Sequence, residues 1–216
     1  MVWIDRILRH FRSRRMRRFA GVFGVTDETR ILDVGGTPFN WSLVDVRPRV
    51  TIVNMPRARE AFDVQFTSVF ADGRDLPFRD RSFDIVFSNS VIEHVGDRES
   101  QSRFAREIAR VGRAYWIETP NRGFPVEPHL FTPFLHFLPL AWQRFIARRF
   151  TIWAMLERPS QDRWEFYIEH YLRDIRLLDA GDLRCLFPGA VILRERLGGL
   201  TKSLIALKKA PGSRCP

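Results

Sequence analysis

Cysteine and long apolar runs are the two features this sequence has least of. Only Cys185 and Cys215 occur, so neither a disulfide framework nor a zinc-ligand spacing is predicted, and a reducing cytoplasm is the expected compartment. No uninterrupted apolar stretch reaches the roughly 18–20 residues that span a bilayer. Near the N-terminus, arginines interrupt the apolar residues where a secretory signal needs a continuous apolar core. With 216 residues, 45% hydrophobic and 28% charged, the chain is expected to form one soluble domain.

Positive charge is concentrated in the first residues. The formal net charge is +10, and residues 1–18 contain seven arginines and one acid, Asp5, which is +6 of that total. Apolar residues recur there at helical spacing, so residues 1–25 are predicted to form a basic amphipathic helix. Three interpretations stay open: the helix packs on the domain, residues 1–20 rest on an anionic membrane, or the segment binds RNA. The apolar positions are Trp3, Ile4, Ile7, Leu8 and Phe11.

Short β-type runs alternate with helical patterns along the chain. Because these runs are mostly apolar, they are typical of parallel strands buried on both faces of a sheet. This alternation predicts a doubly wound α/β sandwich, in which ligands bind beyond the carboxyl ends of the strands. Strands are expected near 30–35, 50–54, 66–71, 83–88, 113–118, 190–197 and 201–208. Helices are expected over 97–111, with Asp97 as N-cap, over 151–170 and over 179–187.

The first strand leads into a short loop, DVGGTP, at residues 33–38. A dinucleotide pyrophosphate needs the pattern G-x-G-x-x-G, which this loop lacks. The acid Asp33 at the strand end would also repel a pyrophosphate, whereas it suits a cofactor that presents a cation. S-adenosylmethionine (SAM) carries an ammonium and a sulfonium but no phosphate, so SAM is the candidate cofactor.

Residues 71–95, ADGRDLPFRDRSFDIVFSNSVIEHV, carry the most specific pattern. They resemble the class I SAM-dependent methyltransferases of the small-molecule type, which share a close relative of A-D-x-x-x-L-P-F-x-D-x-S-F-D-x-V. The resemblance covers residues 28–120 well and 179–208 loosely. It implies a Rossmann-like sandwich whose seven-stranded, mostly parallel sheet has an antiparallel last strand. A methyltransferase domain is therefore expected over 26–210. Residues 123–178 have no clear counterpart in the family, and this insertion is expected to form a lid over the acceptor.

The same resemblance implies where SAM binds. The matching residues are Asp33, Gly35 and Gly36 beside the methionine end, Asn54 at the ribose, Asp72 and Gly73 at the adenine, and Asn89 and Ser90 near the transferring methyl. Two departures stand out, because Thr37 and Phe39 replace loop glycines and Asn54 replaces an acid that usually binds both ribose hydroxyls. Asparagine still accepts one hydrogen bond and donates another, so weaker SAM binding is expected rather than none.

Four residues just after the fourth and fifth strands are candidate catalytic groups: Glu93, His94, Glu127 and His129. Methyl transfer is an in-line displacement, so the protein mainly aligns the reactants and supplies a base where the acceptor holds a proton. Some metal-dependent relatives carry Glu-x-x-Glu-His after the fourth strand, but the segment 90–94 lacks the first carboxylate. No metal is therefore predicted, although Glu127 and His129 could complete a site. The alternative for Glu93 and His94 is a structural role at the strand–helix junction.

The acceptor class follows partly from what is missing after the fourth strand. Base-directed N-methyltransferases carry an N/D-P-P-Y/F motif there, whereas this chain has Ser88-Asn89-Ser90-Val91. Neither cysteine lies near the site, which argues against pyrimidine C5 methylation. A small-molecule or lipid-like acceptor is therefore expected, and nucleic acid is not. Two alternatives stay open: an RNA ribose methyltransferase, and a non-catalytic SAM-binding protein of the same fold.

Overall fold

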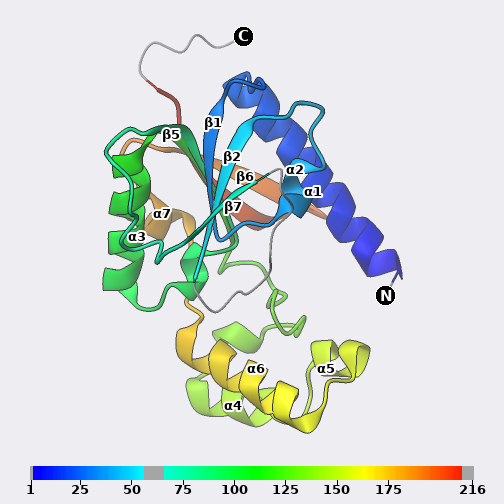
Figure 1. The fold of residues 1–216 in the computed structure, drawn as a ribbon. Helices are drawn as coiled ribbons and strands as arrows, with labels where there is room; N and C mark the ends of the chain where they lie inside the picture. Colours follow the sequence, from blue (N-terminus) through cyan, green and yellow to red (C-terminus); the bar gives the residue numbers. More distant parts are fainter. Residues whose placement is uncertain (1, 56–65, 211–216) are drawn as a thin grey trace.

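The computed structural model describes residues 2–55 and 66–210, with side chains from residue 9 onward (Figure 1). Its centre is a seven-stranded sheet in the order β3-β2-β1-β4-β5-β7-β6. Strand β7 runs antiparallel to both of its neighbours, and the other pairs are parallel, so the predicted sheet is confirmed. The strands are β1 Arg30–Val34, β2 Arg49–Asn54, β3 Thr67–Phe70, β4 Phe83–Asn89, β5 Gly112–Pro120, β6 Val191–Leu197 and β7 Leu200–Lys208.

Helices cover both faces of this sheet and form two apolar cores. Helices α3 (Arg98–Val111) and α7 (Ala180–Leu186) pack on one face. On the other face lie α1 (Val2–Phe23) and the one-turn α2 (Pro38–Trp41) (Figure 1). The central strands β1, β4 and β5 contribute side chains to both cores, as their continuous apolar runs predict.

Local capping fixes where α3 and α7 begin. Asp97 accepts a hydrogen bond from the Ser100 backbone N–H at 2.9 Å, so it is the N-cap that the sequence predicts. At α7, Asp179 and Asp182 each accept a hydrogen bond from the other's backbone N–H, which forms a capping box. These caps orient the two helices from short sequence signals alone.

Helix α1 is part of the domain core along its second half. Met16 and Phe19 are buried, and the Phe19 ring contacts the rings of Phe87 and Trp116 at centroid distances of 5.0 and 5.8 Å. The arginines at 9, 12, 14, 17 and 18 are exposed. The packed interpretation therefore holds for this half of the helix. The predicted apolar side chains Trp3, Ile4, Ile7 and Leu8 lie outside the side chains that the structure describes.

Residues 123–178, which are predicted to be a lid, form a small helical layer with its own apolar cluster, below the sheet in Figure 1. Their role as a lid stays a prediction. The helical pattern expected over 151–170 is divided between two helices, because α5 ends at Glu157 and α6 begins at Gln161. Arg158 adopts a left-handed φ of 45° and precedes Pro159, which has no N–H to continue a helix. The remaining elements are η1 Ile92–His94, η2 Leu135–Phe137, α4 Leu140–Ala147, α5 Ile152–Glu157 and α6 Gln161–Asp174.

Among the described residues, no helix combines the length and the apolar character that crossing a bilayer requires.

Replacing Phe19 by alanine tests whether α1 is part of the core. We expect Phe19→Ala to lower the free energy of unfolding by about 3–5 kcal/mol, because it opens a cavity between two rings. Urea unfolding followed by circular dichroism measures the change. Arg18→Ala, on the exposed side of the same helix, is the control and should shift stability by less than about 0.5 kcal/mol. Equal effects of the two substitutions would contradict the packing of α1.

Candidate active site

Polar side chains gather where β1, β4 and β5 end. The three strands are parallel neighbours, so their carboxyl ends share one edge of the sheet. Asp33 pairs in register with Phe87, and Asn89 pairs with Glu118. Ligands of doubly wound sheets bind beyond this edge, and most of the residues predicted from the sequence lie along it.

Asp33 is fully buried at the end of β1. Its Oδ2 accepts a hydrogen bond from the Trp41 indole N–H at 2.8 Å, while its Oδ1 has no partner. Burial raises the pKa of Asp33 to about 7, and the hydrogen bond from Trp41 offsets part of that rise. A buried carboxylate with one unpartnered oxygen favours a cationic ligand beside it.

The two loop glycines are required by the backbone geometry. Gly35 has a φ of +75°, and a Cβ there would overlap the side chain of Val91. A Cβ on Gly36 would overlap the Asp33 carboxylate. The Asn54 side-chain amide donates to the Gly36 carbonyl at 3.0 Å, so Asn54 positions this loop as well as ending β2.

Asp72 follows β3, and its carboxylate already has a strong partner within the protein. Its carboxylate forms an ion pair with Arg74 at 2.6 Å, and the hydrogen bonds from Arg74 hold its pKa below the usual value. An adenine amino group would therefore compete with Arg74. A Cβ on the adjacent Gly73 would lie 2.7 Å from Cε2 of Phe104, which explains the glycine by packing. The roles predicted for Asp72 and Gly73 stay predictions.

Arg15 of α1 connects the ends of β4, β5 and β6, and the sequence alone did not reveal it. The buried guanidinium donates to Asn89 and lies 3.1 Å from Glu118 Oε1 and 2.7 Å from Glu195 Oε2. Burial by itself lowers the pKa of Arg15, but the charges of Glu118 and Glu195 raise it above its ordinary value. Asn89, expected near the transferring methyl, is thus bonded to α1.

Ser90 continues the same network at the end of β4. It has a left-handed φ of 58°, and its hydroxyl donates to Glu118 Oε2 at 2.9 Å. Its backbone N–H donates to the Glu118 carbonyl, also at 2.9 Å. The buried Glu118 thus holds Ser90 in a strained conformation, of the kind that the surrounding structure must over-determine.

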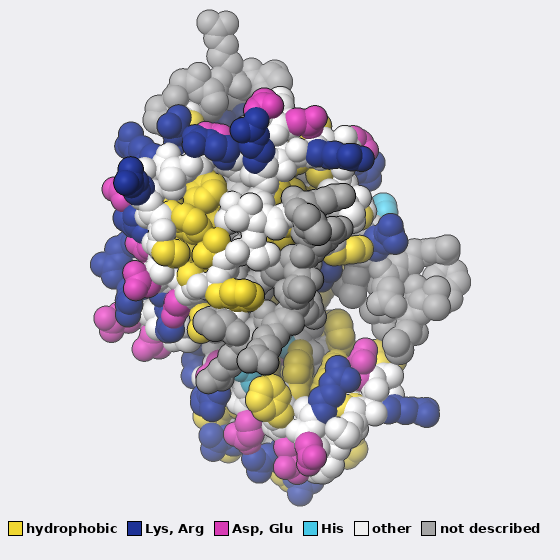
Figure 2. All heavy atoms as spheres, viewed as in Figure 1, with side chains coloured by type: hydrophobic (Ala, Val, Ile, Leu, Met, Phe, Trp, Pro, Cys, Tyr) yellow, Lys and Arg dark blue, Asp and Glu magenta, His cyan; other side chains and the backbone are white. Residues whose placement is uncertain are grey.

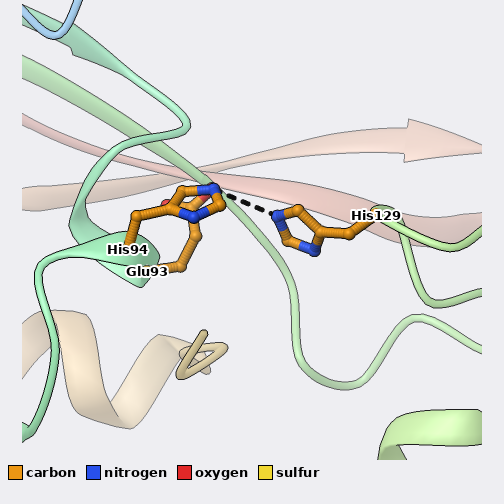
Figure 3. Close-up of side chains that lie close together, drawn as sticks. All are labelled: Glu93, His94 and His129. Carbon is orange, nitrogen blue, oxygen red and sulfur yellow. Dashed lines mark hydrogen bonds between the residues drawn. The ribbon is translucent and has the colours of Figure 1, made fainter. Parts of the chain in front are cut away.

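All four candidate catalytic residues come together where η1 meets residues 127–129, although 32 residues lie between His94 and Glu127 in the sequence. His94 Nε2 lies 3.2 Å from His129 Nε2, as the dashed line in Figure 3 marks. His129 Nδ1 lies 2.7 Å from Glu127 Oε1, and Glu127 is fully buried. Glu127 Oε2 also accepts the backbone N–H groups of His129 and Leu130. Glu127 therefore orients the His129 ring from its Nδ1 side, opposite the Nε2 atom that faces His94.

Glu93 and His94 have environments that disfavour charge. The Glu93 carboxyl is fully buried, its Oε2 accepts a hydrogen bond from the Thr119 hydroxyl at 3.0 Å, and its Oε1 has no partner. Burial raises the pKa of Glu93 to about 7. Burial, followed by the charges of His129 and His170, lowers the pKa of His94 to about 4. His94 is therefore neutral at pH 7 and has a nitrogen lone pair available.

Replacing Arg15 tests the network at the strand ends. We expect Arg15→Ala to lower the free energy of unfolding by about 3–5 kcal/mol, because it leaves the buried Glu118 carboxylate without its cation. Arg17→Ala, exposed on the same helix, is the matched control and should change little. Chemical denaturation at pH 7 compares the two variants. An unchanged midpoint for Arg15→Ala would show that the ion pairs do not stabilise the fold.

Comparison with known proteins gives consistent matches. A family model described as a methyltransferase domain matches residues 39–114. The curated glycine/sarcosine/dimethylglycine N-methyltransferase of Actinopolyspora halophila is 26% identical over 187 residues, covering 78% of this chain and 33% of the relative. This chain therefore spans about a third of the length of that relative.

Solved structures match the fold. The putative methyltransferase complexed with the Trm112 activator in Haloferax volcanii has a TM-score of 0.54 and 16% identity, with 99% of this chain and 96% of that chain covered. The N-terminal domain of EvdMO1 with SAH bound has a TM-score of 0.52 and 15% identity, with coverage of 92% and 81%. At these identities the structures support the fold alone. The pattern over 71–95, the sheet topology and the sequence matches together support a methyltransferase domain of the class I SAM-dependent type in this chain.

Proposed function

We propose that this chain transfers a methyl group from SAM to a small-molecule or lipid-like acceptor. The observation that carries the proposal is the buried Asp33 carboxylate, with an unpartnered oxygen beside a two-glycine loop at the end of β1. The family supports SAM as the cofactor, and the loop lacks the glycines that a pyrophosphate requires.

The residues at the sheet edge fit SAM best at its methionine end. Asp33 Oδ1 is a buried acceptor that an ammonium group would satisfy, and Gly35 and Gly36 keep side-chain atoms away from it. At the ribose, Asn54 gives its amide N–H to the Gly36 carbonyl, which leaves its oxygen as the free acceptor. At the adenine, Arg74 occupies the Asp72 carboxylate. We therefore expect Asp33 to contribute more to SAM affinity than Asp72 does.

When bound, SAM supplies an electrophilic methyl group on a sulfonium. The protein holds and orients the reactants, excludes water and accepts a proton where the acceptor has one. His94 and His129 are the groups proposed to move that proton, because their Nε2 atoms face each other between η1 and the lid. Glu127 keeps His129 oriented by accepting from its Nδ1, which leaves Nε2 for exchange.

The surface of the lid supports a hydrophobic acceptor. Among the described residues, ten of the sixteen large apolar side chains that are exposed lie between residues 134 and 166. In Figure 2, apolar and basic side chains lie side by side over this lower lobe. The relative from Actinopolyspora halophila is named for small amino-acid acceptors, but its likeness to this chain is limited to 26% identity. The exposed apolar residues are Phe134, Phe137, Leu140, Trp142, Phe145, Phe150, Ile152, Met155, Leu156 and Phe166.

Titration calorimetry with SAM and the variant Asp33→Asn tests the proposed function. The variant should bind SAM at least about tenfold more weakly, because it removes a charge-assisted partner of the ammonium. Wild-type affinity should rise from about pH 5.5 to 7, since the pKa of Asp33 is raised to about 7 and its charged form binds the cation. Over that range the α-amino group of SAM, with a pKa of about 8, stays mostly charged. Affinity of the variant should stay flat.

The control for this experiment is Asp45→Asn, an exposed carboxylate a few residues beyond the same loop. It should leave SAM affinity unchanged at each pH. Absence of SAM binding to the wild type at about millimolar ligand would reject the proposal, because cofactors of enzymes bind in or below that range. Binding of SAM without turnover over a panel of hydrophobic acceptors would favour the non-catalytic alternative.

We also propose that residues 1–20 rest on an anionic membrane, supported by the exposed arginines of α1. A basic residue near such a surface contributes about 1 kcal/mol, so Arg14→Glu should weaken vesicle binding by roughly tenfold or more. Co-sedimentation with vesicles containing anionic lipid measures this. Arg106→Glu, exposed on α3 across the sheet, is the control.

Point substitutions are preferable to deleting residues 1–20, because the deletion removes Met16 and Phe19 from the core. Equal pelleting of both variants would argue against membrane contact through α1.

A further inference from the structure

We propose that Glu93, His94 and His129 bind a divalent transition-metal ion of the zinc type. One potential ligand atom from each residue lies within 4.8 Å of the other two. His94 Nε2 and His129 Nε2 are 3.2 Å apart. Two nitrogens that each lie about 2.0–2.1 Å from one ion are separated by roughly 2.9–3.4 Å, so the two imidazoles already have the spacing of ligands to a shared metal.

The orientation of His129 supports the same conclusion. Its Nδ1 lies 2.7 Å from Glu127 Oε1, and a carboxylate at that position requires an N–H there. The Nε2 lone pair then points toward His94, as Figure 3 shows for the two rings. Histidine ligands of metals typically donate their other N–H to a carboxylate or carbonyl in this way. Glu127 is therefore the positioning residue of the proposed site.

Glu93 provides an independent indication. Its carboxyl group is fully buried behind the His94 ring, and only Oε2 has a hydrogen-bond donor, the Thr119 hydroxyl. Oε1 is buried without any partner, and such an atom costs free energy unless a ligand satisfies it. A hydrogen bond between the two imidazoles would explain the 3.2 Å separation by itself, but it leaves this oxygen unsatisfied.

The donor set indicates the class of metal. Two imidazoles and one carboxylate suit zinc and other first-row transition ions, whereas magnesium and calcium prefer sites made of oxygen ligands. Three protein ligands leave at least one coordination position open, as in catalytic rather than structural zinc sites. An oxygen of water or of an acceptor would occupy that position. With the ion bound, both Nε2 lone pairs would be used as ligands, so the two imidazoles would move a proton only in the metal-free protein.

Such an ion would also join two parts of the fold. Glu93 and His94 belong to η1, directly after β4, whereas His129 belongs to the segment 123–178. The Arg176 N–H already joins these parts by donating to the Glu93 carbonyl at 2.8 Å, and within 123–178 the Tyr167 hydroxyl donates to the His129 carbonyl at 3.3 Å. Binding would therefore order residues around His129 against the sheet.

Calorimetry of chelator-treated protein with zinc chloride tests the site, with cobalt chloride and visible absorption as a second probe. We expect one ion per chain. Glu127→Gln should weaken binding by roughly 10–100-fold, as loss of an outer-shell carboxylate does, and His129→Ala by more than that. His136→Ala is the matched control, because His136 lies in the same lid and bonds the Arg122 carbonyl instead. This control should bind zinc like the wild type.

A third measurement does not depend on any variant. Zinc should slow amide hydrogen exchange around residues 127–131 of the wild-type protein, since the ion joins His129 to η1. The absence of saturable zinc or cobalt binding, or equal zinc affinity in wild type and folded His129→Ala, would overturn the proposal. Because every measurement is made without SAM, these outcomes leave the proposed methyl transfer to be judged separately.

Discussion

The buried guanidinium of Arg15 is the interaction on which the sheet edge depends. It joins α1 to Asn89, Glu118 and Glu195, which end or flank three different strands. Without a cation at this point, Glu118 would be a carboxylate in an apolar interior, where solvation is lost. The same Glu118 accepts from the strained Ser90. One arginine on the first helix thus stabilises the turn after β4, from which η1 and its histidine follow.

Helix α1 therefore stabilises the fold in addition to presenting basic side chains to solvent. The loop between β1 and β2 contains only the one-turn α2, so a short helix covers little of that face. Met16 and Phe19 of α1 fill the remaining space over β1, β4 and β5. Arginines at other positions of the same helix stay exposed. A single helix can therefore complete the core, neutralise the sheet edge and still present positive charge to solvent, because its faces point in different directions.

The sequence predicted those parts of the fold that depend on residues close together along the chain. The seven strands are recognisable as apolar runs, and Asp97 is a cap whose signal is a few residues long. Arg15 could not be found this way, since its partners lie 74 to 180 residues along the chain and nothing local separates it from its neighbouring arginines. The break at Arg158 has a local cause as well, because Pro159 restricts the backbone of the preceding residue and ends α5 there.

Four buried acids lie along the site, and their carboxylates are satisfied to different extents. Glu118 has a cation, and Glu127 has two backbone N–H groups and an imidazole. Asp33 and Glu93 each have one hydrogen-bond donor and one oxygen with none, and theirs are the only unpartnered buried carboxylate oxygens among the described residues. A folded protein rarely leaves such atoms unsatisfied without a ligand. The first lies beside the loop expected to receive an ammonium, and the second beside two facing imidazoles, so one constraint underlies both binding proposals.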